Sequence, residues 1–232
     1  MIYLIGGPPR CGKTTLAKIL SQLNRCGWIP VDGLEEIIYS QTPRSLAKKR
    51  FPKNDLCKRT NWENDPLYTS TSIHTIVSAY RRQGYASQKT ITTFVQHLIH
   101  GGHDFILEGH QIHPALASRL TKQFPKEVRT VFLYKENVLH ILKGFTHKTS
   151  AFDWVTEKTL DPSVLPLIAT MLSCFGRWFH KEALRYHLPA YCVETHFQKT
   201  IRDIARIIHS TSSQKVLSKK ELGNEARPSH DR

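Results

Sequence analysis

Long apolar runs and paired cysteines are both missing from this chain of 232 residues. The longest apolar candidate, residues 163–175, is too short to cross a membrane and contains Pro166, so no transmembrane helix is expected. The first five residues carry no basic leader and run into a glycine turn, which argues against a signal peptide. The five cysteines are scattered and include no CxxC pair, which favours reduced thiols over a disulfide scaffold. These absences predict a soluble, cytoplasmic protein.

Motifs for zinc and for RNA are missing as well. Histidines are frequent between residues 97 and 113, at positions His97, His100, His103, His110 and His113. They form neither an HExxH motif nor a Cys/His quartet, so a zinc site is not expected. The chain also has no RNP signature of an RNA-recognition fold.

Acidic residues are scarce, because 19 Asp and Glu stand against 33 Lys and Arg, which gives a formal net charge of +14. Such a field attracts anions, including phosphorylated metabolites, nucleotides and nucleic acid. Net charge reports on solubility and encounter rather than on a site, so a solvated basic surface without a partner is the alternative.

Short apolar runs alternate with amphipathic segments along the chain. Strands are expected at residues 2–5, 28–31, 105–107, 130–134 and 190–193, and helices at 14–23, 34–39, 73–82, 91–100 and 198–209. This alternation predicts a three-layer α/β/α domain over residues 1–210, with a five-stranded, mostly parallel sheet. Residues 211–232 are polar and are expected to form a disordered basic tail.

One motif in this frame carries chemistry. Residues 7–14 read G-x-x-x-x-G-K-T between a strand and a helix, which is the pattern and the context of a phosphate-binding P-loop. Pro8 and Pro9 lack N–H groups, so the donors must come from Arg10 onwards. Lys13 is expected at the β- and γ-phosphates, and the Thr14 hydroxyl at Mg²⁺. The residues expected to hold ATP are Gly7, Arg10, Cys11, Gly12, Lys13, Thr14 and Thr15.

The thiol of Cys11 lies within this loop. A nearby helix N-terminus is expected to lower its pKa, which offers a point for oxidation or alkylation. An inert loop residue is nevertheless the favoured interpretation.

Two carboxylates follow predicted strands, where an open α/β sheet collects its ligand. Asp32 follows the second strand and Glu108 the third, and either side chain suits Mg²⁺ or the proton of an acceptor hydroxyl. For Asp32 the alternative is a turn or the cap of the next helix, and for Glu108 a charged residue that only reaches the surface.

The stretches "YLIGGPPRCGKTTLAK", "VDGLEEII" and "DFILEGHQIHP" resemble P-loop small-molecule kinases related to 2-phosphoglycerate kinase. In that family a strand ending in Glu-Gly is followed within a few residues by His and Pro, as Glu108-Gly109-His110 and His113-Pro114 are here. The resemblance implies a nucleoside-monophosphate-kinase-like core that uses ATP and Mg²⁺ to phosphorylate a small acceptor. It also implies that Asp32 and Glu108 manage the acceptor and the metal.

Two intervals depart from this pattern or extend it. The expected lid at residues 140–160 offers Lys143, His147 and Lys148 but no arginine, so Arg177 or Arg185 would have to reach in from the following helix. The interval 40–90, expected as an irregular and then helical insertion on the acceptor side, is basic. Its cationic side chains suit an anionic acceptor, or else form ordinary surface: Lys48, Lys49, Arg50, Arg81 and Arg82.

The favoured hypothesis is therefore an ATP-dependent kinase in which Lys13, Asp32 and Glu108 are catalytic, Thr14 and Glu108 bind the metal, and the acceptor is a small anion. Within enzymes, a nucleotide kinase or a toxin-like sugar-nucleotide kinase is the alternative. Outside enzymes, it is an ATP-sensing module that binds nucleic acid through the basic insertion. The acceptor and the oligomeric state stay open.

Overall fold

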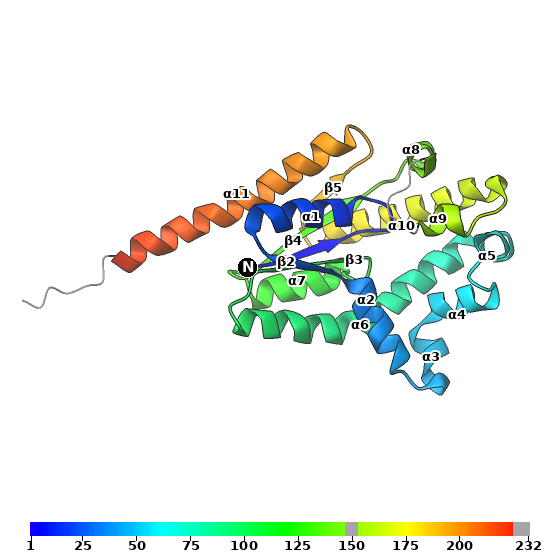
Figure 1. The fold of residues 1–232 in the computed structure, drawn as a ribbon, viewed down its shortest axis with the longest axis horizontal. Coiled ribbons are helices and arrows are strands. Elements are labelled where there is room, and N and C mark those ends of the chain that lie inside the picture. Colours follow the sequence, from blue (N-terminus) through cyan, green and yellow to red (C-terminus); the bar gives the residue numbers. More distant parts are fainter. Residues whose placement is uncertain (147–152, 225–232) are drawn as a thin grey trace, which may run out of the picture.

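One parallel sheet organises the chain. The structure is a computed structural model that describes residues 1–146 and 153–224, with side chains up to residue 210 (Figure 1). The strands are β1 (Ile2–Gly6), β2 (Gly27–Pro30), β3 (Phe105–Gly109), β4 (Val128–Tyr134) and β5 (Ala190–Cys192). They lie in the order β2-β3-β1-β4-β5, and every neighbouring pair is parallel.

Helices cover both faces of this sheet. The helices flanking or following the strands are α1 (Lys13–Asn24), α7 (Pro114–Gln123), α8 (Val138–Lys143), α9 (Trp154–Glu157), α10 (Leu165–Arg185) and α11 (Phe197–Asn224). Two short 3₁₀ turns occur at Gly144–Thr146 and Pro162–Val164. The predicted three-layer α/β/α fold is thereby confirmed.

Strand β1 shows how the two layers arise from the alternation of its side chains. Tyr3 and Ile5 are buried in the core shared with α1 and α11, whereas Ile2 and Leu4 are buried in the larger core beneath α6, α7 and α10. Burial of each aliphatic side chain contributes about 1.5–3 kcal/mol, so the central strand is held firmly from both sides. Its register pairs Ile5 with Glu108 and Gly6 with Gly109, which sets the start of the P-loop beside the end of β3.

The interval 40–90 is helical throughout most of its length. It comprises the end of α2 (Val31–Ser40), then α3 (Arg44–Arg50), α4 (Pro52–Arg59), α5 (Asn64–Ser70) and the first part of α6 (Ile73–His100). Figure 1 shows α3, α4 and α5 grouped at one end of the molecule, beside the start of α6. The expected irregular stretch is therefore a set of short helices.

Helix α6 differs from the prediction of two helices. It runs unbroken for 28 residues and contains Gly84, which lies against the His113 ring. A Cβ on Gly84 would come within 2.4 Å of His113 Nε2, so the glycine permits close packing instead of ending the helix. Glycine in a helix interior lowers helix stability by about 1 kcal/mol relative to alanine, which is small beside the free energy gained by burying the apolar face of α6.

The C-terminal segment also differs from the prediction. Helix α11 continues to Asn224, through residues 211–224 of the expected tail, and residues 225–232 lie outside the described residues. Across the part of the chain that the structure describes, no helix is long and apolar enough to cross a membrane.

Candidate active site

The turn between β1 and α1 has the backbone geometry of a phosphate cradle. Gly7 and Gly12 have φ values of 141° and 91°, a region that favours glycine. A Cβ on Gly7 would lie 2.1 Å from the Leu133 carbonyl, and one on Gly12 would lie 2.6 Å from the Phe197 ring. The amides of the first turn of α1 have no intrahelical acceptor, so they face the loop as donors for an anion.

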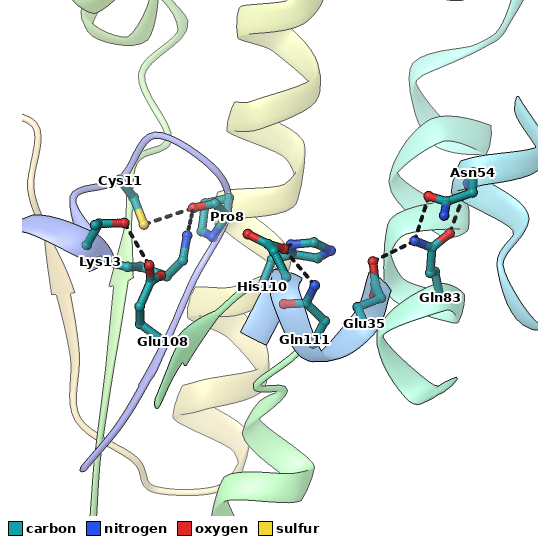
Figure 2. A network of polar contacts seen from close by, with 11 residues as sticks. Pro8, Cys11, Lys13, Glu35, Asn54, Gln83, Glu108, His110 and Gln111 are labelled. Atoms are coloured by element: carbon teal, nitrogen blue, oxygen red, sulfur yellow. Dashed lines mark hydrogen bonds and ion pairs between the residues drawn. The ribbon is translucent and has the colours of Figure 1, made fainter. Parts of the chain in front are cut away.

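Lys13 is buried at the base of this loop. Its Nζ donates a hydrogen bond to the Pro8 carbonyl at 2.7 Å, and only 8% of the residue is exposed. Figure 2 shows the ammonium group folded back under the loop beside Glu108. If a phosphate replaced the Pro8 carbonyl as the partner, the ammonium group would face a full negative charge instead of a neutral carbonyl oxygen.

Cys11 does not have the activated thiol that its position suggested. Burial raises its pKa, and this effect outweighs the opposing charges of Lys13 and Lys135. The Sγ atom donates to the Pro8 carbonyl at 3.0 Å, and the residue is 1% exposed. This burial agrees with the favoured interpretation of Cys11 as an inert loop residue, because oxidation and alkylation require the thiolate.

Glu108 meets the P-loop through Thr14. The Thr14 hydroxyl donates to Glu108 Oε1 at 2.7 Å, which joins the first turn of α1 to the end of β3. Glu108 lies inside β3 and is 4% exposed, so it is not a residue that only reaches the surface. Burial raises the pKa of its carboxyl, while the Lys13 charge and the Thr14 hydrogen bond oppose the shift.

Asp32 lies in a different element from the one predicted. Strand β2 ends at Pro30, and Asp32 belongs to the first turn of α2, where a carboxylate complements the helix dipole. Gln111 Nε2 donates to Asp32 Oδ1 at 2.8 Å, and His110 Nδ1 lies 3.5 Å from the same oxygen. Its side chain is 67% exposed, so an acceptor can reach it.

The charge state of Asp32 follows from its neighbours. Although the side chain is open to an acceptor, the protein around its base displaces water and tends to raise the pKa of its carboxyl, but the His110 charge, the Gln111 hydrogen bond and the charges of Lys13 and Lys53 together lower it. Burial in turn lowers the pKa of His110, although the nearby carboxylates oppose this effect. At neutral pH the pair is therefore a carboxylate beside a neutral imidazole.

A second polar chain begins at Glu35, on the same helix as Asp32, and leads into the helical insertion. Gln83 Nε2 donates to Glu35 Oε1 at 2.7 Å and to Asn54 Oδ1 at 3.0 Å, and the Asn54 amide donates to Gln83 Oε1 at 2.9 Å. Figure 2 shows this chain spanning α2, α4 and α6. Glu35 Oε2 and Asn54 Nδ2 are buried without a hydrogen-bond partner among the described residues. No sequence motif identifies this chain, since its members come from three separate helices.

The expected lid contacts the P-loop through Arg10. Its guanidinium forms an ion pair with Asp153, donates to the Gly144 carbonyl at 2.9 Å and lies 5.1 Å from the centre of the Phe145 ring. Arg10 was expected to contribute its backbone amide, and this role of its side chain was missed. The contact holds the loop to the segment that follows α8.

The other predicted cations do not gather at the P-loop. Arg81 stacks on Trp178 at 4.7 Å, and Arg177 donates to Ser173 and Cys174 of its own helix. Arg82 is exposed on α6, and Lys143 is exposed in the last turn of α8. Lys148 and His147 lie outside the described residues. The expectation that Arg177 reaches the phosphates is not met in this conformation.

Two cations that the sequence analysis did not single out lie closer to the site. Lys135 follows β4, and its charge acts on Cys11 and on Arg10. Lys53 of α4 lies 5.6 Å from the centre of the Tyr80 ring, and its charge acts on Asp32 and His110. Spacing could not reveal either residue, because each reaches the site from a separate element.

The donor set fits a magnesium nucleotide. Mg²⁺ prefers oxygen ligands and keeps several waters and phosphate oxygens, which suits the paired Thr14 hydroxyl and Glu108 carboxylate. Within the described ranges, no three His, Cys, Asp or Glu side chains gather to hold a metal by themselves. Thr14 and Glu108 would therefore hold the ion together with a bound nucleotide.

Comparisons with known proteins show the following. No family model matches the chain. No curated protein matches it either. Similar solved structures include a gluconokinase from Sinorhizobium meliloti 1021, with 10% identity, coverage of 94% of this chain and 96% of the other, and a TM-score of 0.48. A shikimate kinase from Bacteroides thetaiotaomicron has 12% identity, coverage of 91% and 97%, and a TM-score of 0.44. Likenesses this distant leave the activity to be inferred from the site.

Proposed function

We propose that this protein is an ATP-dependent phosphotransferase that transfers the γ-phosphate to a hydroxyl group of a small acceptor. The observation that carries the proposal is the contact between Thr14 and Glu108 beside the buried Lys13 ammonium group. This arrangement brings a hydroxyl, a carboxylate and a cation to the point where a P-loop presents its terminal phosphate. A bound magnesium nucleotide would supply the phosphoryl group and part of the charge neutralisation.

The chain's own residues then divide the work. The glycine turn and the first-turn amides of α1 bind the phosphates, and Lys13 stabilises negative charge on them. Glu108 and Thr14 would hold the metal ion that accompanies the nucleotide. Asp32 accepts a hydrogen bond from the acceptor hydroxyl and takes its proton as the oxygen bonds to phosphorus and the bond to the ADP oxygen breaks.

The surroundings of Asp32 favour an acceptor rich in hydroxyl groups. Carboxylates and amides predominate there, and Lys53 is the cation whose charge reaches Asp32 from the insertion. Lys48, Lys49 and Arg82, which suggested an anionic acceptor, line a separate pocket. The 2-phosphoglycerate-kinase-like activity and the nucleotide-kinase alternatives stay predictions.

An acceptor screen tests the proposal. ADP formation is measured from ATP and Mg²⁺ with panels of sugars, nucleosides and phosphorylated acids, for wild type, Lys13→Ala and Lys18→Ala. Lys18 is an exposed lysine of the same helix and serves as the matched control. We expect acceptor-dependent ADP release that falls roughly 100-fold or more in Lys13→Ala and is unchanged in Lys18→Ala.

Two outcomes would contradict the proposal. Equal turnover by wild type and Lys13→Ala would show that the loop does not serve catalysis. ATP binding without ADP release for any acceptor would instead support the ATP-sensing alternative.

A further inference from the structure

A pocket of about 590 Å³ opens in the helical insertion, between α3, α4 and α6. We call it the insertion pocket. Five charged side chains line it, and four of them are cationic: Lys48, Lys49, Arg59 and Arg82, with Asp55 as the carboxylate. Its volume lies within the range of roughly 300–1,000 Å³ that small-molecule sites occupy.

The positive charge of the insertion pocket is largely uncompensated. Asp55 is already engaged, because it forms an ion pair with Arg59 one turn along α4. Among the described residues, no carboxylate forms an ion pair with Lys48, Lys49 or Arg82. Cations that converge on one hollow without counter-charges repel one another, and an anion bound among them relieves that repulsion.

The insertion pocket is separate from the site around Asp32. On α4, Pro52, Asp55, Leu56 and Arg59 recur at helical spacing and line the pocket. Asn54 lies on the opposite side of the same helix, where it contacts Gln83 in the chain that leads to Glu35 (Figure 2). Helix α4 therefore lies between the pocket and the proposed acceptor site, and one ligand cannot fill both.

We infer that the insertion pocket binds a small polyanion that carries two or more phosphate groups. Lysine ammonium groups serve as point charges for phosphate oxygens, and the Arg82 guanidinium offers a fork that binds them with two parallel hydrogen bonds. Hydroxyl donors also line the pocket, from Ser45 on α3 and from Thr75 and Ser78 on α6. One phosphate group engages only part of such a lining, whereas two or more span cations on different helices.

Inorganic pyrophosphate is the probe, and its stoichiometry is measured by isothermal titration calorimetry on the full chain. The P-loop is the second site for this probe, so wild type should bind two molecules per chain and Lys13→Ala one. The double variant Lys48→Gln/Lys49→Gln should lose the site in the insertion pocket, or bind pyrophosphate there about tenfold more weakly. The matched control, Lys122→Gln/Lys126→Gln, removes the same charge from exposed lysines elsewhere and should retain both sites.

Arg82→Gln provides an independent variant on α6 and should weaken the same site, with folding of every variant checked by circular dichroism. Two undiminished sites in the Lys48/Lys49 and Arg82 variants, or an equal loss in the control, would overturn the inference. If only Lys13→Ala loses a site and the pocket variants bind like wild type, this inference fails and the proposed function stands. If only the pocket variants lose a site and Lys13→Ala binds like wild type, the proposed function fails and this inference stands.

A second arm separates small polyanions from nucleic acid, which presents the same phosphate chemistry. A short single-stranded RNA is titrated into wild type and the Lys48→Gln/Lys49→Gln variant at two salt concentrations. We expect pyrophosphate to bind at the pocket, and the RNA to bind wild type and the Lys48→Gln/Lys49→Gln variant with equal affinity. If the RNA binds through these lysines and pyrophosphate does not bind there, the pocket is a nucleic-acid surface and the inference fails.

Discussion

His113 is a buried imidazole whose titration should control the stability of the protein in mild acid. It is 1% exposed, and the rings of Tyr85, Trp178 and Phe179 surround it, with centroids 5.0, 5.0 and 6.2 Å away. Neither ring nitrogen has a hydrogen-bond partner among the described residues. Burial lowers its pKa from 6.5 to about 3, and the charges of His110 and Arg81 act in the same direction.

The size of the effect follows from proton linkage. The unfolded chain binds a proton at this position below about pH 6.5, whereas the folded chain does not until about pH 3, so stability falls as the pH drops between these values. At pH 5 the loss is about 2 kcal/mol relative to pH 8, and this value depends little on the folded pKa as long as that pKa stays well below 5. The full loss, below pH 3, is about 5 kcal/mol.

The assay is urea unfolding followed by tryptophan fluorescence, at pH 8, 7, 6 and 5, for wild type, His113→Leu and His97→Leu. His113 does not cap α7 with its side chain, so leucine removes the titrating group while filling a similar volume. We expect the pH-dependent loss of the free energy of unfolding to be smaller in His113→Leu by about 2 kcal/mol. His97 is exposed on α6, so its variant should follow wild type. If His113→Leu loses as much stability as wild type between pH 8 and 5, the reasoning is refuted.

Three further predictions concern the candidate site. Glu108→Gln should raise the free energy of unfolding at pH 7 in metal-free buffer, because burial raises the pKa of Glu108 and so disfavours its charged form in the folded state. The same variant should lower ADP release by roughly 100-fold, since the metal loses a ligand. A less stable variant would contradict the stability prediction. Asp32→Asn should reduce ADP release by roughly 100-fold or more with unchanged ATP affinity by calorimetry, and an equal loss of ATP affinity would remove Asp32 from the acceptor side. Arg10→Gln and Asp153→Asn should each cost about 3–5 kcal/mol in urea unfolding, because each leaves a buried charge without its ion-pair partner. The double variant should cost less than the sum, and strict additivity would refute the ion pair.

The local features of this site could be predicted from the sequence. The P-loop is contiguous, so its glycines, Lys13 and Thr14 could be assigned before any contact was known. Glu108 was found because apolar residues precede it in a strand and a parallel sheet collects strand ends at one edge. The five strands could also be predicted, because each is a short apolar run between helical segments.

Other features depended on contacts between distant segments. The two helices expected at residues 73–82 and 91–100 are one helix, in which Gly84 packs against His113. The lysines of α3 and Arg82 looked like an acceptor site, yet they line a separate pocket because each helix has more than one face. The pKa of Cys11 was expected to fall because the residue lies near a helix N-terminus, but its burial has the larger effect and raises the pKa.

The sequence by itself determined the succession of strands and helices along the chain, the phosphate loop and the two acidic residues that follow strands, because these depend on neighbouring residues and on hydrophobic periodicity. Only the tertiary structure decided which groups meet: Glu108 with Thr14, Arg10 with Asp153, and Gln83 with both Glu35 and Asn54. Such pairs form between residues far apart in the chain, and their geometry and burial arise from the packing of whole helices against the sheet.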